Sequence, residues 1–93
     1  MLKRIGVVGI VINEPQAIAD KVNLIISHYS HLIMGRMGIP KSAEQIGVIA
    51  LIVEGTTDDI GALTGKLGNL PGIIVKSAFT AQQIKNKGAL SND

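Results

Sequence analysis

Two short apolar runs constrain most strongly what this chain can fold into. Residues 5–12 read IGVVGIVI and residues 46–53 read IGVIALIV. Both runs are rich in β-branched residues and shorter than an ordinary core helix, so each predicts a buried β-strand. They also resemble each other, which indicates a weak internal repeat. We therefore expect a sheet built around these two strands.

A helix is expected after each run. Behind the first, Asn13 or Glu14 can cap a helix and Pro15 suits its first position. Its apolar stripe at helical spacing is Ile18, Val22, Ile25, Ile26 and Tyr29. Behind the second run, residues 56–59 (TTDD) offer caps and carboxylates to a helix N-terminus. The stripe of that helix is Ile60, Leu63, Leu67 and Leu70.

Each helix leads into a further strand. Residues 31–37 (HLIMGRM) follow the first helix, and the turn signal at 71–72 (PG) precedes residues 73–80 (IIVKSAFT). This βαββαβ order predicts an α+β two-layer sandwich, a four-stranded antiparallel sheet with both helices on one face. The first and third strands are expected at the centre. The second and fourth carry Arg36 and Lys76 and are expected at the edges, where charge prevents unwanted pairing.

The chain length and composition limit the classes of partner. One domain is expected over residues 1–80, with a polar tail at 81–93, and a domain of this size often gains stability by oligomerisation. Only Tyr29 and Phe79 are aromatic, so stacking platforms for single-stranded nucleic acid are missing. No apolar stretch approaches the roughly 18 residues of a membrane span. The absence of cysteine agrees with a cytoplasmic location and excludes thiolate chemistry.

The stretch HLIMGRMGIP (31–40) places Arg36 between two glycines, Gly35 and Gly38. Glycine within a strand marks a bulge, a bend or the close approach of a ligand or another chain. A guanidinium matches a carboxylate or phosphate in two-pronged fashion. We therefore predict a ligand-binding site for a small anionic effector at Gly35, Arg36 and Gly38. The alternative is that Arg36 only protects an edge strand or pairs with a carboxylate of another subunit.

Other motifs carry weaker functional interpretations. His28 and His31 in SHYSH could converge on a metal, although a histidine near a helix C-terminus is also favoured by the helix dipole. The glycines of GALTGKLG (61–68) indicate close packing against the neighbouring helix or another subunit, because no Ser or Thr follows the lysine as in a phosphate-binding loop. No paired acid and base residues are evident. We predict no enzyme activity and no cofactor.

The segment VINEPQAIADKV (11–22) resembles the strand-to-helix turn of ACT domains, small regulatory modules that bind amino acids at subunit interfaces. Asn13 and Pro15 match the pattern of that turn, whereas Gln16 stands where the family has glycine. The resemblance implies that Asn13 joins the ligand-binding residues from the first turn.

A closer resemblance covers residues 3–80. SHYSHLIMGRMGIP (27–40) and IALIVEGTTDDIGALTGKLGNLPGIIVK (49–76) are similar to ACT-like regulators of iron-only hydrogenase systems, relatives of the C-terminal domain of nickel-responsive regulators. This resemblance implies a ferredoxin-like (ACT-like) fold, oligomerisation and a regulatory role.

The chain also departs from the nickel-responsive regulators. GRMGIP and IGVIAL stand where those proteins have histidines on the second strand and a cysteine on the third, so no metal site is predicted. The chain begins at its first strand and is expected to lack a DNA-binding element of its own. We predict a non-catalytic sensor or regulatory module acting as a homo-oligomer, a dimer or a tetramer. The alternatives are an adaptor that binds another protein through its edge strands, and a metal-binding protein that uses His28 and His31.

Overall fold

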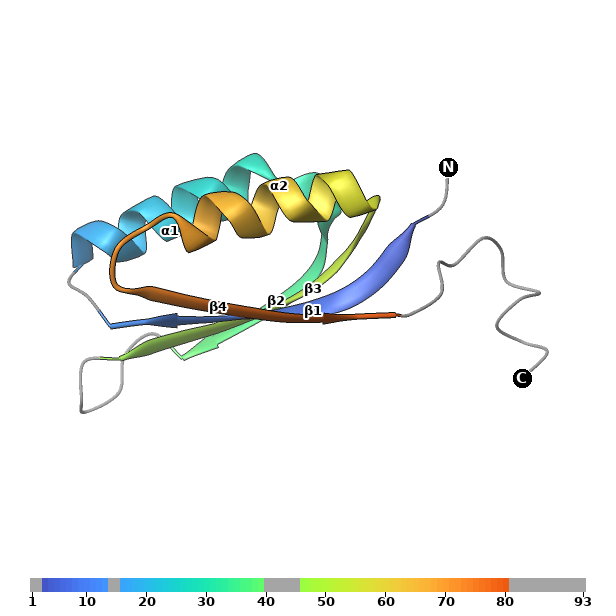
Figure 1. Ribbon diagram of the computed structural model, residues 1–93. Coiled ribbons are helices and arrows are strands. Elements are labelled where there is room, and N and C mark those ends of the chain that lie inside the picture. Colours follow the sequence, from blue (N-terminus) through green and yellow to red (C-terminus); the bar gives the residue numbers. More distant parts are fainter. Residues whose placement is uncertain (1–2, 14–15, 40–45, 81–93) are drawn as a thin grey trace.

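The computed structural model describes residues 3–13, 16–39 and 46–80 of the chain. Its elements are β1 (Arg4–Ile12), α1 (Gln16–His28), a short 3₁₀ helix (Ser30–Leu32), β2 (Ile33–Ile39), β3 (Gly47–Gly55), α2 (Thr57–Gly68) and β4 (Ile73–Phe79). Both helices cover the same face of the sheet (Figure 1). The predicted βαββαβ sandwich is thereby confirmed. The tail predicted at 81–93 and the helix start predicted at 14–15 lie outside the described residues.

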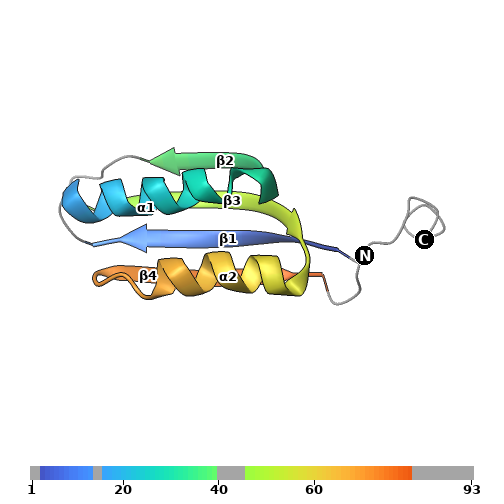
Figure 2. The same cartoon turned by 90° about the horizontal axis from the view of Figure 1, so that it is seen from above.

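The four strands form one antiparallel sheet in the order β2-β3-β1-β4. The two apolar runs are therefore the central strands, and Arg36 and Lys76 lie on the two edge strands, as predicted. Seen from above, α1 lies over β3 and α2 over β4, while β2 extends to the outside (Figure 2). The strand predicted to begin at residue 31 begins at Ile33, because His31 and Leu32 lie in the 3₁₀ helix.

The core lies between the helices and the sheet. Alternate residues of the central strands are buried against the helices, which is the period-2 pattern of a half-covered strand. Among the described residues the buried side chains are all aliphatic: Val8, Ile10, Ile12, Val22, Ile26, Leu32, Ile49, Leu51, Val53, Ile60, Leu63 and Leu67. The predicted stripes are confirmed within the helices, where Ile18 and Ile25 pack at the margin of the core. Tyr29 and Leu70, predicted as the last members of the two stripes, also pack against the core but lie just beyond the ends of α1 and α2.

Local signals fix where α2 begins and how the chain leaves it. The hydroxyl of Thr56 accepts a hydrogen bond from the Asp59 amide at 3.1 Å, which caps a helix start that also carries Asp58. After the helix, Gly72 adopts a φ of 74°, a conformation that favours glycine. Its carbonyl accepts a hydrogen bond from the Asn13 amide at 2.9 Å, which ties this turn to the end of β1.

Neither helix of the described chain has the length and apolar content that crossing a membrane requires.

Candidate functional site

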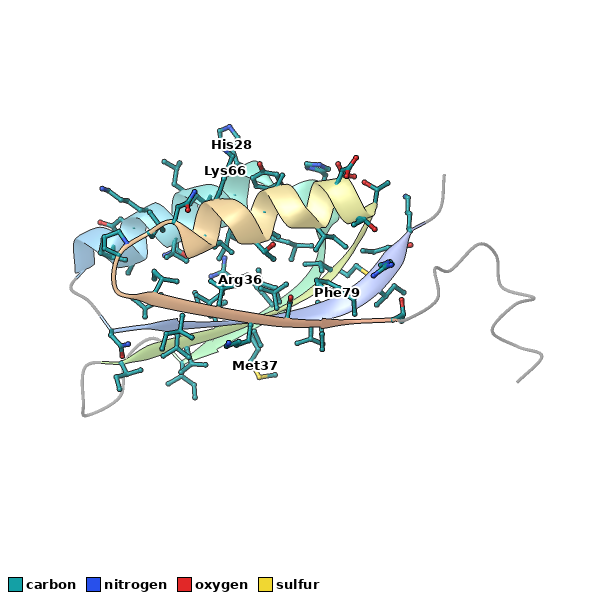
Figure 3. The ribbon with its side chains drawn as sticks, viewed as in Figure 1. His28, Arg36, Met37, Lys66 and Phe79 are labelled. Carbon is teal, nitrogen blue, oxygen red and sulfur yellow. The ribbon has the colours of Figure 1, made fainter. Side chains whose placement is uncertain are left out.

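A β-bulge in β2 decides which way Arg36 points. Ile33 pairs with Val53 and Gly35 pairs with Ile52, so Met34 is an extra residue in the edge strand. Because side chains alternate along a strand, one extra residue reverses the alternation beyond it. Arg36 consequently pairs with the buried Leu51 and faces the helices. Figure 3 shows Arg36 between sheet and helices, and Met37 on the opposite face of the sheet.

The guanidinium of Arg36 reaches α1. Its Nη2 donates a hydrogen bond to Oδ1 of Asn23 at 3.1 Å, and both side chains remain exposed to solvent. Asn23 is neutral, so this contact orients the guanidinium without neutralising its charge. The NH₂ group of the same amide keeps two donors for a further acceptor. Arg36 and Asn23 together therefore present positive charge and hydrogen-bond donors at one place.

This pair stands in a groove of about 370 Å³ between α1 and the β2 edge of the sheet. The lining residues are Ile12, Ala19, Asn23, Arg36, Gly38, Ile39, Gly47, Val48 and Ile49. Three of these lining residues, Ala19, Gly38 and Gly47, have a small side chain or none. A Cβ at Gly38 would lie 3.4 Å from the Val48 carbonyl oxygen and 3.6 Å from Ile49 Cγ1.

The structure brings together two of the four predicted ligand-binding residues. Arg36 and Gly38 both line the groove. Gly35 precedes Arg36 in the strand and pairs with the exposed Ile52, so a side chain there would point away from the helices into open space. Asn13 is exposed just beyond Ile12, which does line the groove. The roles predicted for Gly35 and Asn13 stay predictions.

Sequence reasoning did not find Asn23 and Ala19. They are four residues apart and so share one face of α1, a relation that helical periodicity reveals. Which strand faces that side of the helix depends on the sheet order and on the bulge at Met34, and neither is encoded in local spacing. Only the assembled sheet brings Arg36 within reach of Asn23.

The two histidines lie apart from this groove. His28 lies with Tyr29, Leu24, Ile25 and Lys66 around a smaller, mostly apolar hollow of about 180 Å³ between the helices. The ring of His31 stacks on Tyr29 with 6.3 Å between centroids. Within residues 3–13, 16–39 and 46–80 no three His, Cys, Asp or Glu side chains gather as a metal site would require.

The glycines of α2 do not pack against α1. A Cβ built at Gly61, Gly65 or Gly68 meets no atom within 4 Å. Of the two explanations that the sequence offers, close contact with the neighbouring helix is therefore wrong. Contact with another subunit stays a prediction.

The fold of this chain and its family match agree with each other. A four-stranded antiparallel sheet with βαββαβ connections and both helices on one face defines a ferredoxin-like, ACT-like domain. The chain belongs to the TM1266-like family, described as "Iron-only hydrogenase system regulator, putative", whose model matches residues 4–77. No curated protein matches the chain.

Solved structures agree with this family and fold. Uncharacterized protein TM1266 from Thermotoga maritima is 34% identical with a TM-score of 0.79, and the match covers 83% of this chain and 96% of that one. The ACT domain from GTP pyrophosphokinase of Chlorobium tepidum matches in its solution structure at 17% identity and a TM-score of 0.65, over 88% and 91% of the two chains. Its crystal structure matches at 18% and 0.67, over 80% and 96%. The predicted relation to nickel-responsive regulators stays a prediction.

Proposed function

We propose that this chain is a non-catalytic regulatory module of an iron-only hydrogenase system that works as a homo-oligomer and binds a small anionic effector in the Arg36 groove. Membership of the regulator family supports the role. The single observation that carries the binding site is the guanidinium of Arg36, held by a neutral amide at 3.1 Å in a groove of about 370 Å³.

The lining of the groove indicates what such an effector looks like. A carboxylate or phosphate would pair with Arg36 and accept a further bond from the NH₂ group of Asn23. Aliphatic side chains, among them Ile12 and Ile49, offer an apolar wall beside these polar groups. The volume lies toward the lower end of the roughly 300–1,000 Å³ of small-molecule sites. These features favour a metabolite of modest size with one anionic group and a short apolar body.

The position of the groove suits an oligomer. It opens beside β2, an edge strand whose outer side has no partner strand in the described chain. A neighbouring subunit that approaches this edge would close the groove, as the sequence predicts for an effector held at a subunit interface. Asn13 and Gly35 would then contact the effector or that neighbour.

The test is a thermal-shift screen with amino acids, short-chain carboxylates and nucleotides. A ligand that binds only the folded state at a hundred times its Kd adds about 2.7 kcal/mol of stability, and so raises Tm. Arg36→Ala should abolish the shift because the anion loses its charged partner, and Gly38→Val should abolish it by filling the groove. The oligomer should stay intact in both variants.

Lys66→Ala is the matched control, since it removes one exposed cation from α2 without touching the groove. It should respond to the effector as the wild type does. An unchanged response of Arg36→Ala would remove this arginine from the site. If no anion in the screen stabilises the wild type, the effector part of the proposal is wrong. Gly35→Val tests the remaining glycine, and a lost response there would extend the site beyond the groove.

A further inference from the structure

The face of the sheet that is turned away from the helices is strongly apolar. We call it the open face, made of the residues that the strand register places opposite the core side: Ile5, Val7, Gly9, Val11, Gly35, Met37, Ile39, Val48, Ala50, Ile52, Glu54, Ile74, Lys76 and Ala78. Six exposed large hydrophobic side chains lie on it, with exposed fractions from 39% to 77%. They are Val7, Met37, Ile39, Val48, Ile52 and Ile74.

These side chains form continuous rows across the sheet. The row through Val11 contains Ile39, Val48 and Ile74, and is apolar on all four strands. The row through Val7 is apolar as well, with Ile52 beside it on β3. Scattered exposed hydrophobic residues are normal on a monomer, whereas a contiguous patch marks an interaction surface.

Two charged residues of opposite sign share the open face within the paired strands, and their positions are related. Glu54 lies on β3 opposite Ile5, and Lys76 lies on β4 opposite Gly9. Strands β3 and β4 flank β1 on opposite sides. Usual strand spacings put the two residues roughly 16 Å apart, too far to pair within one chain.

The register gives this arrangement a two-fold character. Val7 is midway between Ile5 and Gly9 on β1, so it lies at the midpoint of the line from Glu54 to Lys76. Met37, a residue that is 77% exposed, is at about equal distance from both charges, roughly 14 Å at usual spacings. A two-fold axis through Val7 and Met37, lying in the plane between two such faces, therefore exchanges Glu54 with Lys76.

We propose that the open face binds a second copy of this chain about that axis, with Glu54 of each copy against Lys76 of the other. A symmetric dimer interface must be self-complementary, and a single pair of opposite charges related by the axis forms two reciprocal contacts. The apolar rows would be buried between two stacked sheets, and Val7 and Met37 would each meet their own copies at the axis. This inference rests on the homo-oligomer in the proposed function. It adds a second contact surface, distinct from the one proposed at the β2 edge, together with its symmetry.

Charge reversal tests the pairing by light scattering after size exclusion and by sedimentation. Glu54→Lys alone or Lys76→Glu alone places like charges against each other twice, and should raise the dimer dissociation constant by about tenfold or more. The double variant Glu54→Lys with Lys76→Glu restores opposite charges and should recover most of the wild-type affinity. Circular dichroism of each variant establishes that its fold is intact, so that a misfolded single variant is not mistaken for a dissociated one.

A cross-link tests the axis independently. The chain contains no cysteine, so Met37→Cys introduces the one thiol of the molecule. This cysteine would lie near the two-fold axis and therefore close to its copy in the other chain. The variant should form covalent dimers under mild oxidation or with a short bismaleimide. Leu24→Cys is the matched control, because Leu24 is 65% exposed but lies on α1, and it should stay uncross-linked at the same concentration.

The outcomes separate this inference from the proposed function. An oligomer that keeps its affinity in both charge-reversed single variants, or cross-links equally at Leu24 and Met37, would place the interface elsewhere and overturn the inference while the homo-oligomer stands. A wild type that is monomeric at tens of micromolar would overturn both the homo-oligomer and the open-face dimer. A protein of different sequence would then be the remaining candidate partner for the open face. Failure of the effector screen would leave the inference untouched.

Discussion

At the scale of single residues, Thr56 makes a contribution that can be measured directly. Its hydroxyl accepts the Asp59 amide at 3.1 Å and so satisfies a donor at the N-terminus of α2 that has no partner within the helix. Thr56→Ala should lower the free energy of unfolding by about 1 kcal/mol, the usual effect of losing an N-cap. Chemical denaturation at matched protein concentration measures the loss.

Thr57→Ala is the control for Thr56→Ala, because Thr57 is exposed and already within the helix. Alanine has the higher helix propensity, so this variant should leave the unfolding free energy unchanged or raise it by a few tenths of a kcal/mol. Equal losses in the two variants would show that the hydroxyl of Thr56 does not cap the helix in solution.

Single residues can be predicted from the sequence where the local backbone geometry favours only a few residue types. The cap at Thr56 and the glycine turn at Gly72 both follow from local sequence, because capping and a positive φ each favour few residue types. The glycines on either side of Arg36 in the sequence mark it as a candidate site residue. Its partner Asn23 has no such local signal, since nothing nearby distinguishes it from any other asparagine on an exposed helix face.

At the scale of elements, the strand–helix order could be predicted because each element has its own apolar period. The two central strands show unbroken apolar runs, and both helices show stripes at helical spacing. The bulge at Met34 could not be predicted, although glycine in β2 indicated an irregularity. A bulge is a property of the pairing between β2 and β3, and its consequence is large, because it turns Arg36 from the open face to the groove.

Helix α2 carries glycines that its own packing does not require. Because a Cβ at Gly61 or Gly65 meets open space, alanine there should raise the unfolding free energy by about 0.5–1 kcal/mol through higher helix propensity and a less flexible unfolded chain. Thermal and denaturant unfolding of Gly61→Ala and Gly65→Ala measure the gain.

Gly6→Ala should lower the unfolding free energy, and it serves as the comparison for the two α2 variants. A Cβ at Gly6 would overlap the ring of Phe79 and lie 2.6 Å from the Ala78 carbonyl oxygen, so we expect a loss of about 1–3 kcal/mol from overpacking.

If Gly61→Ala instead weakens association of the subunits while the monomer stays folded, the α2 glycines contact another subunit. That result would support the second explanation drawn from the sequence.

At the scale of the whole molecule, the two faces of the sheet are covered unequally. One face buries an aliphatic core under two helices, and the other leaves six large hydrophobic side chains exposed in the described chain. The sequence indicated this imbalance through apolar residues at almost every position of the central strands, a pattern typical of strands buried on both faces. The single chain supplies helices for only one face.

A second covered face would make stability depend on protein concentration. If two 93-residue chains fold and associate together, a tenfold rise in concentration favours the folded dimer by about 1.4 kcal/mol. An assembly of this size changes its Tm by about 2–4 °C per kcal/mol, so Tm should rise by roughly 3–6 °C for each tenfold increase. Heating scans followed by circular dichroism from one to one hundred micromolar measure the slope, and a second scan of each sample separates reversible dissociation from aggregation.

A monomer has no such dependence, since folding then involves one chain on each side of the equilibrium. A reversible Tm that is constant over this range would therefore show that the open face stays uncovered in the isolated protein.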